Sequence, residues 1–126
     1  MLLIFLVVSL PAPAQPKDDT AHRIQFKPGQ TSAVVRGTVK RGADVTYELR
    51  ARQGQRLTLR LTSTSKKRDD VVFSLAGPNG NEMGGSSGMG ALTHFSGELS
   101  STSDYLINVS ANKSRVARYM LEVVIK

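Results

Sequence analysis

The stretch VTYELRARQGQRLTLRLTS, residues 45–63, decides the fold class. On both sides of its central Gln53-Gly54-Gln55, apolar side chains fall at every second position and polar or basic side chains fill the places between. A β-strand has this period of two, because it turns successive side chains to opposite faces. We therefore predict two strands joined by a glycine-containing turn. The short loop favours an antiparallel hairpin with one apolar face and one basic face.

The rest of the chain continues in the same manner. Short alternating segments are separated by turns rich in glycine, proline and charged residues, and no segment has a convincing helical period. This pattern predicts an all-β protein, an antiparallel β-sandwich of seven to eight strands with a jelly-roll-like arrangement, or an open barrel. Gly37, inside one of the segments, indicates a bulge or a close approach of the backbone. The further strands are expected at 23–26, 32–40, 71–76, 92–99, 105–110 and 119–125, and a long loop at 81–91.

The apolar faces of these segments predict the core. Since alternate residues of a strand share one face, the interior should be formed by one apolar set from each strand. We expect it to contain Val35, Val39, Val45, Tyr47, Leu49, Leu57, Leu59, Leu61, Phe73, Leu75, Tyr105, Ile107, Val109, Leu121, Val123 and Ile125.

The 126 residues have room for a single domain behind a leader. Residues 1–10 are almost wholly apolar and are followed by the small-residue run Pro11-Ala12-Pro13-Ala14, which is typical of a signal peptide and its cleavage site. A buried first helix is the alternative. We predict a signal peptide at 1–14, a linker at 15–22 and the β-sandwich domain at 23–126. The chain has no cysteine, so neither disulfides nor thiolate metal sites can form.

The chemistry of the chain argues against catalysis. The two histidines, His22 and His94, stand alone, which predicts surface or strand-edge imidazoles rather than metal ligands. No G-x-S-x-G nucleophile motif is present, and the glycine-rich segment 84–88 lacks the lysine of a phosphate-binding loop. We therefore predict a protein that is not an enzyme and holds no metal or other cofactor.

The charge of the chain indicates which kinds of partner it could bind. The formal net charge is +7, which in an exported protein favours anionic partners, although a merely soluble surface would also tolerate it. Nucleic acid is not expected, because the aromatic residues do not interleave with the basic ones and export separates the chain from it. Basic residues gather in three predicted turns, where side chains are free to meet a partner. They are Lys40-Arg41, then Lys66-Lys67-Arg68, then Lys113, Arg115 and Arg118.

The order of motifs resembles a known family. The segments FKPGQTSA at 26–33, RARQGQRL at 50–57 and SGEL followed by STSDY at 96–105 carry the resemblance, together with the strand VVFSLAGP and the closing YMLEVVIK. They are similar to the bacterial periplasmic inhibitors of g-type lysozyme, over nearly the whole mature chain. The wider pre-peptidase C-terminal domains, which are jelly-roll-like sandwiches, share these features less specifically.

The resemblance implies a function and a site. Loops at one end of the sandwich would enter the cleft of a g-type lysozyme, in the periplasm or outside a bacterial cell, and arginine side chains would pair with acidic groups there. By position the matching loops are the turn at 41–44 and the connector at 113–118. The residues implied are Arg41, Asp44, Lys113, Arg115 and Arg118.

Two other functions remain open on the sequence. The protein could be a non-catalytic module that binds peptidoglycan or another anionic envelope polymer, through the basic strand face formed by Arg50, Arg52, Arg56 and Arg60. It could also be a structural sandwich that docks onto another secreted protein. Neither requires a membrane-inserted segment in the mature protein.

Overall fold

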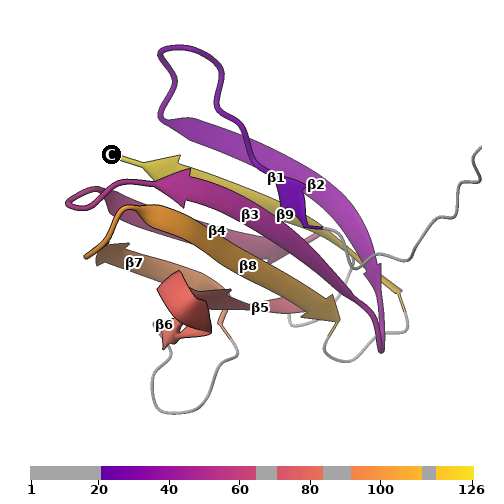
Figure 1. Ribbon diagram of the computed structural model, residues 1–126. Helices are drawn as coiled ribbons and strands as arrows, with labels where there is room; N and C mark the ends of the chain where they lie inside the picture. The colour runs from indigo at the N-terminus through magenta and orange to yellow at the C-terminus, as the bar shows by residue number, and fades with distance from the viewer. Residues whose placement is uncertain (1–20, 65–70, 84–91, 112–115) are drawn as a thin grey trace, which may run out of the picture.

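Two β-sheets packed face to face form the protein (Figure 1). The computed structural model describes residues 21–64, 71–83, 92–111 and 116–126. One sheet has the order β1 (His22–Arg23), β3 (Asp44–Ala51), β8 (Ser103–Ala111), β5 (Val71–Ala76) and β6 (Glu82–Met83). The other has the order β2 (Ser32–Lys40), β9 (Val116–Ile125), β4 (Arg56–Ser63) and β7 (His94–Glu98). A 3-10 turn, η1 (Pro78–Gly80), lies between β5 and β6.

The topology is that of a jelly roll. The β2-β9-β4-β7 sheet faces β3-β8-β5-β6, so the chain passes from one sheet to the other at nearly every connection. All neighbouring strands are antiparallel except β1, which runs parallel to β3. The predicted antiparallel sandwich is confirmed. The described residues form nine strands, two of which are only two residues long.

The predicted hairpin over 45–63 is wrong, although both of its strands form. β3 pairs with β8 and β4 pairs with β9 and β7, and the turn at 52–55 carries the chain between the sheets. This crossing directs the apolar faces of both strands into one interior. The turn is held by the 99–102 loop, because Gly54 N donates to Leu99 O at 2.8 Å and Gln53 N to Thr102 Oγ1 at 3.0 Å.

The predicted core is buried between the sheets, except that Val35 and Val45 are only partly buried. The predicted list left out several interior residues. Ala51, Val71 and Tyr119 continue the apolar alternation of the predicted strands, whereas Ile24 and Leu99 lie just beyond the ends of β1 and β7. Among the described residues, the additional buried apolar ones are Ile24, Ala51, Val71, Leu99, Ala117 and Tyr119.

Gly37 marks the close approach that its position predicts. It lies opposite Tyr119 in the β2–β9 pair, and a Cβ at Gly37 would sit 2.5 Å from the Tyr119 hydroxyl oxygen. The Tyr119 ring crosses the interior, and its hydroxyl lies 2.6 Å from that of Tyr47 on the other sheet. Burial, followed by the hydrogen bond with Tyr47, raises the pKa of Tyr119 well above its ordinary value. A buried polar pair thus ties the two sheets together.

Several strand boundaries differ from those predicted. β1 begins at His22, which the sequence assigned to the linker, and β9 begins at Val116 rather than at residue 119. β7 begins at His94, because Leu92 instead exchanges backbone hydrogen bonds of 2.8 Å with Phe73 of the facing sheet. The predicted signal peptide and most of the predicted long loop lie outside the described residues. In the described part of the chain, no helix is long and apolar enough to cross a membrane.

Candidate functional site

Three connections of the chain meet at one end of the sandwich. The strand registers pair Lys40 with Val116, Asp44 with Ser110 and Val71 with Ala111. The turn between β2 and β3 therefore lies beside the strand ends that flank segments 65–70 and 112–115, and Figure 1 shows the tips of β2, β3, β8 and β9 together there. We call this region, defined by the turn 40–44 and Arg118, the basic end. It collects the connections to which the three basic clusters belong.

The turn 40–44 presents Arg41. Ala43 N donates to Lys40 O at 3.0 Å, which closes a four-residue turn, and Gly42 has a φ of 86°. A positive φ at the third residue is the feature of a type II turn and is adopted at low cost by glycine. Arg41 precedes this glycine and is exposed. The turn thus fixes the backbone on which the guanidinium group is carried.

Asp44 is held by its neighbours on the outer face of its sheet. Asn108 Nδ2 donates to Asp44 Oδ2 at 3.2 Å, and Thr46 Oγ1 donates to Asn108 Oδ1 at 3.2 Å. Both contacts run between β3 and β8, which are antiparallel neighbours. The Asp44 side chain therefore anchors the end of the turn to the sheet.

Arg118 lies on the outer face of β9, opposite Thr38, and is exposed. Thr64 N donates to the backbone oxygen of Arg118 at 2.9 Å, which joins the end of β4 to this position. An open groove of about 380 Å³ runs past the side chain. It is lined by Arg36, Gly37, Thr38, Thr64, Arg118 and Tyr119. The prediction that Arg118 belongs to the connector 113–118 is wrong, because β9 already begins at Val116. Lys113 and Arg115, the other residues predicted for that connector, lie outside the described residues.

Two residues that line the groove, Arg36 and Tyr119, were not predicted as site residues from the sequence. Arg36 pairs with Met120 and Thr38 with Arg118, so Arg36 and Arg118 are diagonal neighbours on one sheet face, within reach of long side chains. Arg36 Nη2 contacts Met120 Sδ at 3.6 Å. Two guanidinium groups at one groove suit a carboxylate ligand. Tyr119 forms the floor of the groove beneath them. In the sequence, Gly37 was the single sign that something would approach the backbone closely at this place.

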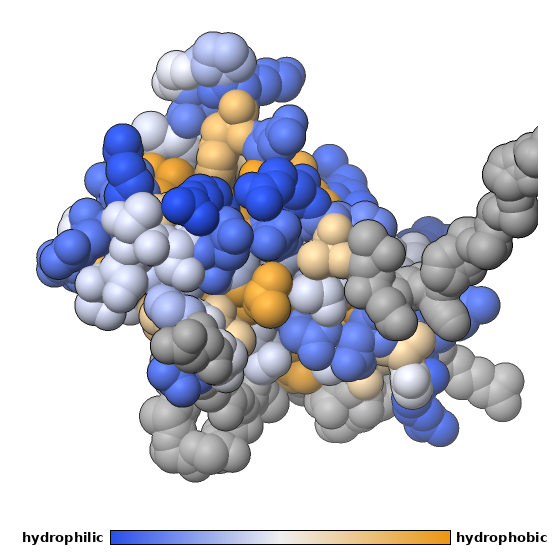
Figure 2. All heavy atoms as spheres, in the orientation of Figure 1, coloured by the Kyte–Doolittle hydropathy of each residue, from blue (hydrophilic) through white to orange (hydrophobic). Residues whose placement is uncertain are grey.

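The predicted basic face of Arg50, Arg52, Arg56 and Arg60 is wrong. Arg50 is on β3, whereas Arg56 and Arg60 are on β4 in the other sheet, and Arg52 lies in the turn between them. Arg50 lies on the β3 side, where its Nη1 is 3.5 Å from Asp104 Oδ1. Arg56 lies on the opposite outer face, and its Nη1 donates to Ser96 Oγ at 3.3 Å. Figure 2 shows the face that carries β3 and β8 as mainly hydrophilic, with apolar side chains in small islands. A single stripe for an anionic polymer is not formed.

The histidines have the surroundings that their isolation predicts. His22 and His94 are both exposed, and they lie on β1 and β7, which are edge strands of the two sheets. The His22 ring packs against Tyr47, with ring centroids 5.8 Å apart. Within the described ranges, no three histidine or carboxylate side chains are grouped as metal ligands would be.

The fold and the described residues define a class: a jelly-roll sandwich with the basic turn 40–44 and Arg118 at one end. Comparison with solved structures identifies proteins of this shape. A periplasmic inhibitor of g-type lysozyme (PliG) from Aeromonas hydrophila has a TM-score of 0.69 and 24% sequence identity, covering 85% of this chain and 96% of its own. The PliG of Salmonella Typhimurium has a TM-score of 0.59 and 23% identity, covering 82% of this chain and 96% of its own.

A mutant PliG from Escherichia coli is also similar, with a TM-score of 0.58, 17% identity and coverage of 84% of this chain and 97% of its own. At these identities the likeness establishes the fold. No protein family model matches the sequence, and no curated protein matches it.

Proposed function

We propose that this protein is a periplasmic inhibitor of g-type lysozyme, without enzymatic activity or cofactor, which blocks the enzyme's cleft with its basic end. One observation carries the proposal. The strand registers bring the turn 40–44 and Arg118 to the same end of a sandwich whose fold is shared with three periplasmic lysozyme inhibitors. The predicted signal peptide supports the same compartment.

The mechanism follows from the chemistry of the two sides. Glycosidases work through carboxyl groups at the scissile bond, and a guanidinium group pairs with a carboxylate through two parallel hydrogen bonds while remaining charged. Arg41 stands in the tight turn between β2 and β3, and Arg118 stands on β9 itself. Because the sandwich already orders the backbone of these residues, less conformational entropy is lost when the loops enter a cleft.

A lysis assay tests the proposal directly. The purified protein is added in increasing amounts to a g-type lysozyme acting on bacterial cell walls, with c-type and i-type lysozymes as comparisons. We expect turnover of the g-type enzyme to fall at about equimolar protein and the other two to be much less affected, since a cleft is recognised by its shape and charge together. Unchanged lysis at a large excess of the protein would contradict the proposal.

Substitutions locate the inhibitory surface. We expect Arg118→Ala combined with Arg115→Ala to weaken inhibition by about 2 kcal/mol or more, as central arginine contacts do in protein interfaces. Arg41→Ala should weaken it further. Arg56→Ala is the matched control, because Arg56 is exposed but lies at the start of β4, at the opposite end of the sandwich. If Arg56→Ala weakens inhibition as much as the double substitution, the basic end is not the inhibitory surface.

A further inference from the structure

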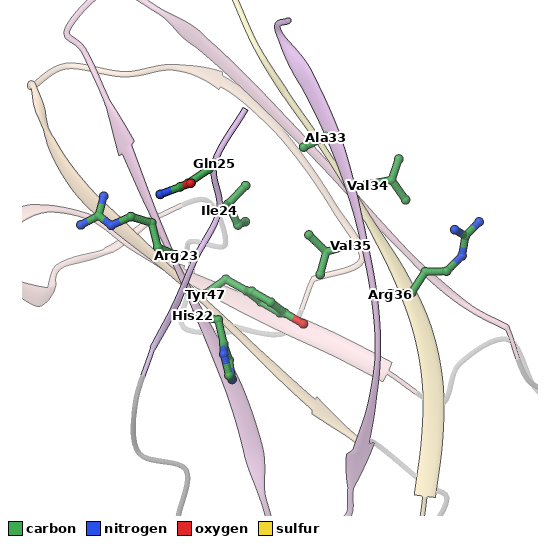
Figure 3. A pocket seen from close by; sticks show the side chains of 9 residues that line it. All are labelled: His22, Arg23, Ile24, Gln25, Ala33, Val34, Val35, Arg36 and Tyr47. Atoms are coloured by element: carbon green, nitrogen blue, oxygen red, sulfur yellow. The ribbon is translucent and has the colours of Figure 1, made fainter. Parts of the chain in front are cut away.

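The seam between β1 and β2 contains an open groove of about 430 Å³. Figure 3 shows Ile24, Ala33, Val35 and Tyr47 directed into the space between the two strands, with Arg23 and Gln25 on one rim and Val34 and Arg36 on the other. The groove is thus apolar inside. On the β2 rim Arg36 is basic, whereas Arg23 on the other rim is paired with Glu48 at 3.1 Å. The proposed inhibition does not use it.

The strand beside this groove is an open sheet edge. β2 pairs with β9 only, and it is nine residues long, whereas β1, β6 and β7, the other edge strands of the described residues, have two, two and five residues. Ile125 N donates to Thr31 O at 2.8 Å, so the odd-numbered residues of β2 turn their backbone groups to β9. Val34, Arg36 and Thr38 therefore direct their backbone N–H and C=O groups outward. A long open edge is a template for another strand.

From these two features we infer that β2 binds an extended peptide segment of another protein, with alternating apolar and acidic residues, as an added strand. Backbone pairing with Val34 and Arg36 supplies the hydrogen bonds. Every second side chain of the peptide would enter the apolar groove beside Val35, because residues of a strand alternate between faces. The intervening side chains would lie on the outer face next to Arg36, where a carboxylate forms a charge-assisted pair.

Two other occupants fit the edge less well. An acyl chain would fill the apolar groove but would leave the outward N–H groups of Val34 and Arg36 without partners. A second copy of the chain would bring Arg36 and Lys40 of both copies onto one ladder, and each copy has a formal net charge of +7. The charge of the edge and the direction of its backbone groups together favour an acidic peptide.

The groove adjoins the basic end, because Arg36 lines both this groove and the groove beside Arg118. The inference does not rest on the proposed inhibition, and its test is a binding measurement without lysozyme.

A labelled peptide of about eight residues, in which valine and glutamate alternate, is the probe, a length typical of a strand. Fluorescence anisotropy measures its binding to the purified protein, with a valine–lysine peptide as the comparison. We expect the acidic peptide to bind at least about tenfold more tightly than the basic one, and added salt to reduce the difference. Equal binding of the two peptides, or no binding of the acidic one, would overturn the inference.

Arg36→Glu should weaken binding of the acidic peptide by about tenfold or more, since it reverses the charge beside the added strand. Arg60→Glu is the matched control, because Arg60 is exposed on the same outer face but stands on β4, beyond β9. We expect this control to change affinity less than about twofold, because separated exposed charges are screened. Equal losses in both variants would indicate general charge attraction and overturn the inference.

Amide hydrogen exchange followed by NMR supplies a readout specific to strand addition. The amides of Val34, Arg36 and Thr38 should become protected when the acidic peptide binds. Binding without that protection would overturn the inference. Displacement of the peptide by oleate, without protection of these amides, would assign the groove to a lipid and would also overturn the inference. A concentration-dependent dimer that Arg36→Glu abolishes would assign the edge to a second copy, with the same consequence.

Discussion

Gly37→Ala should destabilise the protein through the ring that covers this glycine. A Cβ placed on Gly37 would lie 2.5 Å from the hydroxyl oxygen of Tyr119 and 2.8 Å from its Cζ. Tyr119 is 1% exposed and its hydroxyl lies 2.6 Å from that of Tyr47, so the ring cannot withdraw without disturbing the buried pair. Overpacking a core costs about 1–3 kcal/mol, and a buried hydroxyl left without its partner costs about 1–3 kcal/mol.

We therefore expect a loss of about 2–4 kcal/mol in the free energy of unfolding, the lower part of the summed range, because the backbone can relax partly. Urea denaturation followed by circular dichroism measures it. Gly97→Ala is the control, since a Cβ there would meet the end of the Phe95 ring at 3.0 Å, and Phe95 is only partly buried on the edge strand β7. We expect this control to lose less than about 1 kcal/mol.

The same substitution in a Tyr119→Ala protein distinguishes the steric cause from a general cost of alanine in this strand. In a Tyr119→Ala protein the ring is absent, so adding Gly37→Ala should cost nothing or stabilise by about 0.4–1 kcal/mol through the unfolded chain. The interaction energy between the two sites is then about 2 kcal/mol or more. Equal losses from Gly37→Ala in both backgrounds would refute the reasoning.

Three further predictions use the same purified protein. Leu59→Ala removes a side chain that is 0% exposed, and should reduce the free energy of unfolding measured in urea by about 2–5 kcal/mol. Gly42→Val strains a residue with a φ of 86° by about 1–2 kcal/mol and should also weaken lysozyme inhibition; Gly54→Val, with a φ of 89° at the opposite end, should be destabilised equally but inhibit normally. Because the pKa of Tyr119 is raised in the folded protein, the unfolded chain loses this proton first above about pH 10, so stability should be intact below that pH and fall by up to about 1.4 kcal/mol per pH unit above it. Unfolding curves measured at several alkaline pH values should show a smaller fall in the free energy of unfolding per pH unit in Tyr119→Phe.

The faces of the strands could be predicted from the sequence, but their partners could not. Alternation assigns Leu49 and Leu57 to the interior whatever strand lies beside them, because it depends only on the pleat. The choice between a hairpin and a crossing at 52–55 is made by contacts far along the chain. Gln53 N, for example, donates to Thr102 Oγ1, 49 positions later. Such non-local pairing leaves no local signal in the sequence.

The candidate site shows the same division. The turn that carries Arg41 and Asp44 could be predicted, since a basic segment with glycine is visible in the sequence. Arg36 could not, because it sits inside a strand and becomes a neighbour of Arg118 only through the β2–β9 register. Asp44 differs again: the sequence marks it as a candidate contact, whereas its hydrogen bond to Asn108 shows what holds the turn. The pairing register of the strands must therefore be known before basic residues in the sequence can be assigned to one surface.

That register also explains why the strand ends that flank three distant basic clusters lie at one end. Successive strands of this jelly roll run in opposite directions, so the connections after β2, β4 and β8 must all leave from the same end. Lys40-Arg41, Lys66-Lys67-Arg68 and Lys113 with Arg115 belong to these connections. The opposite end also has basic residues, namely Lys27, Arg52, Arg56 and Lys126, but they are single residues of separate segments. We therefore expect an acidic cleft to attract the basic end first, because long-range fields orient partners before contact. On this argument the position of the charge, more than its total of +7, governs how the protein meets an enzyme.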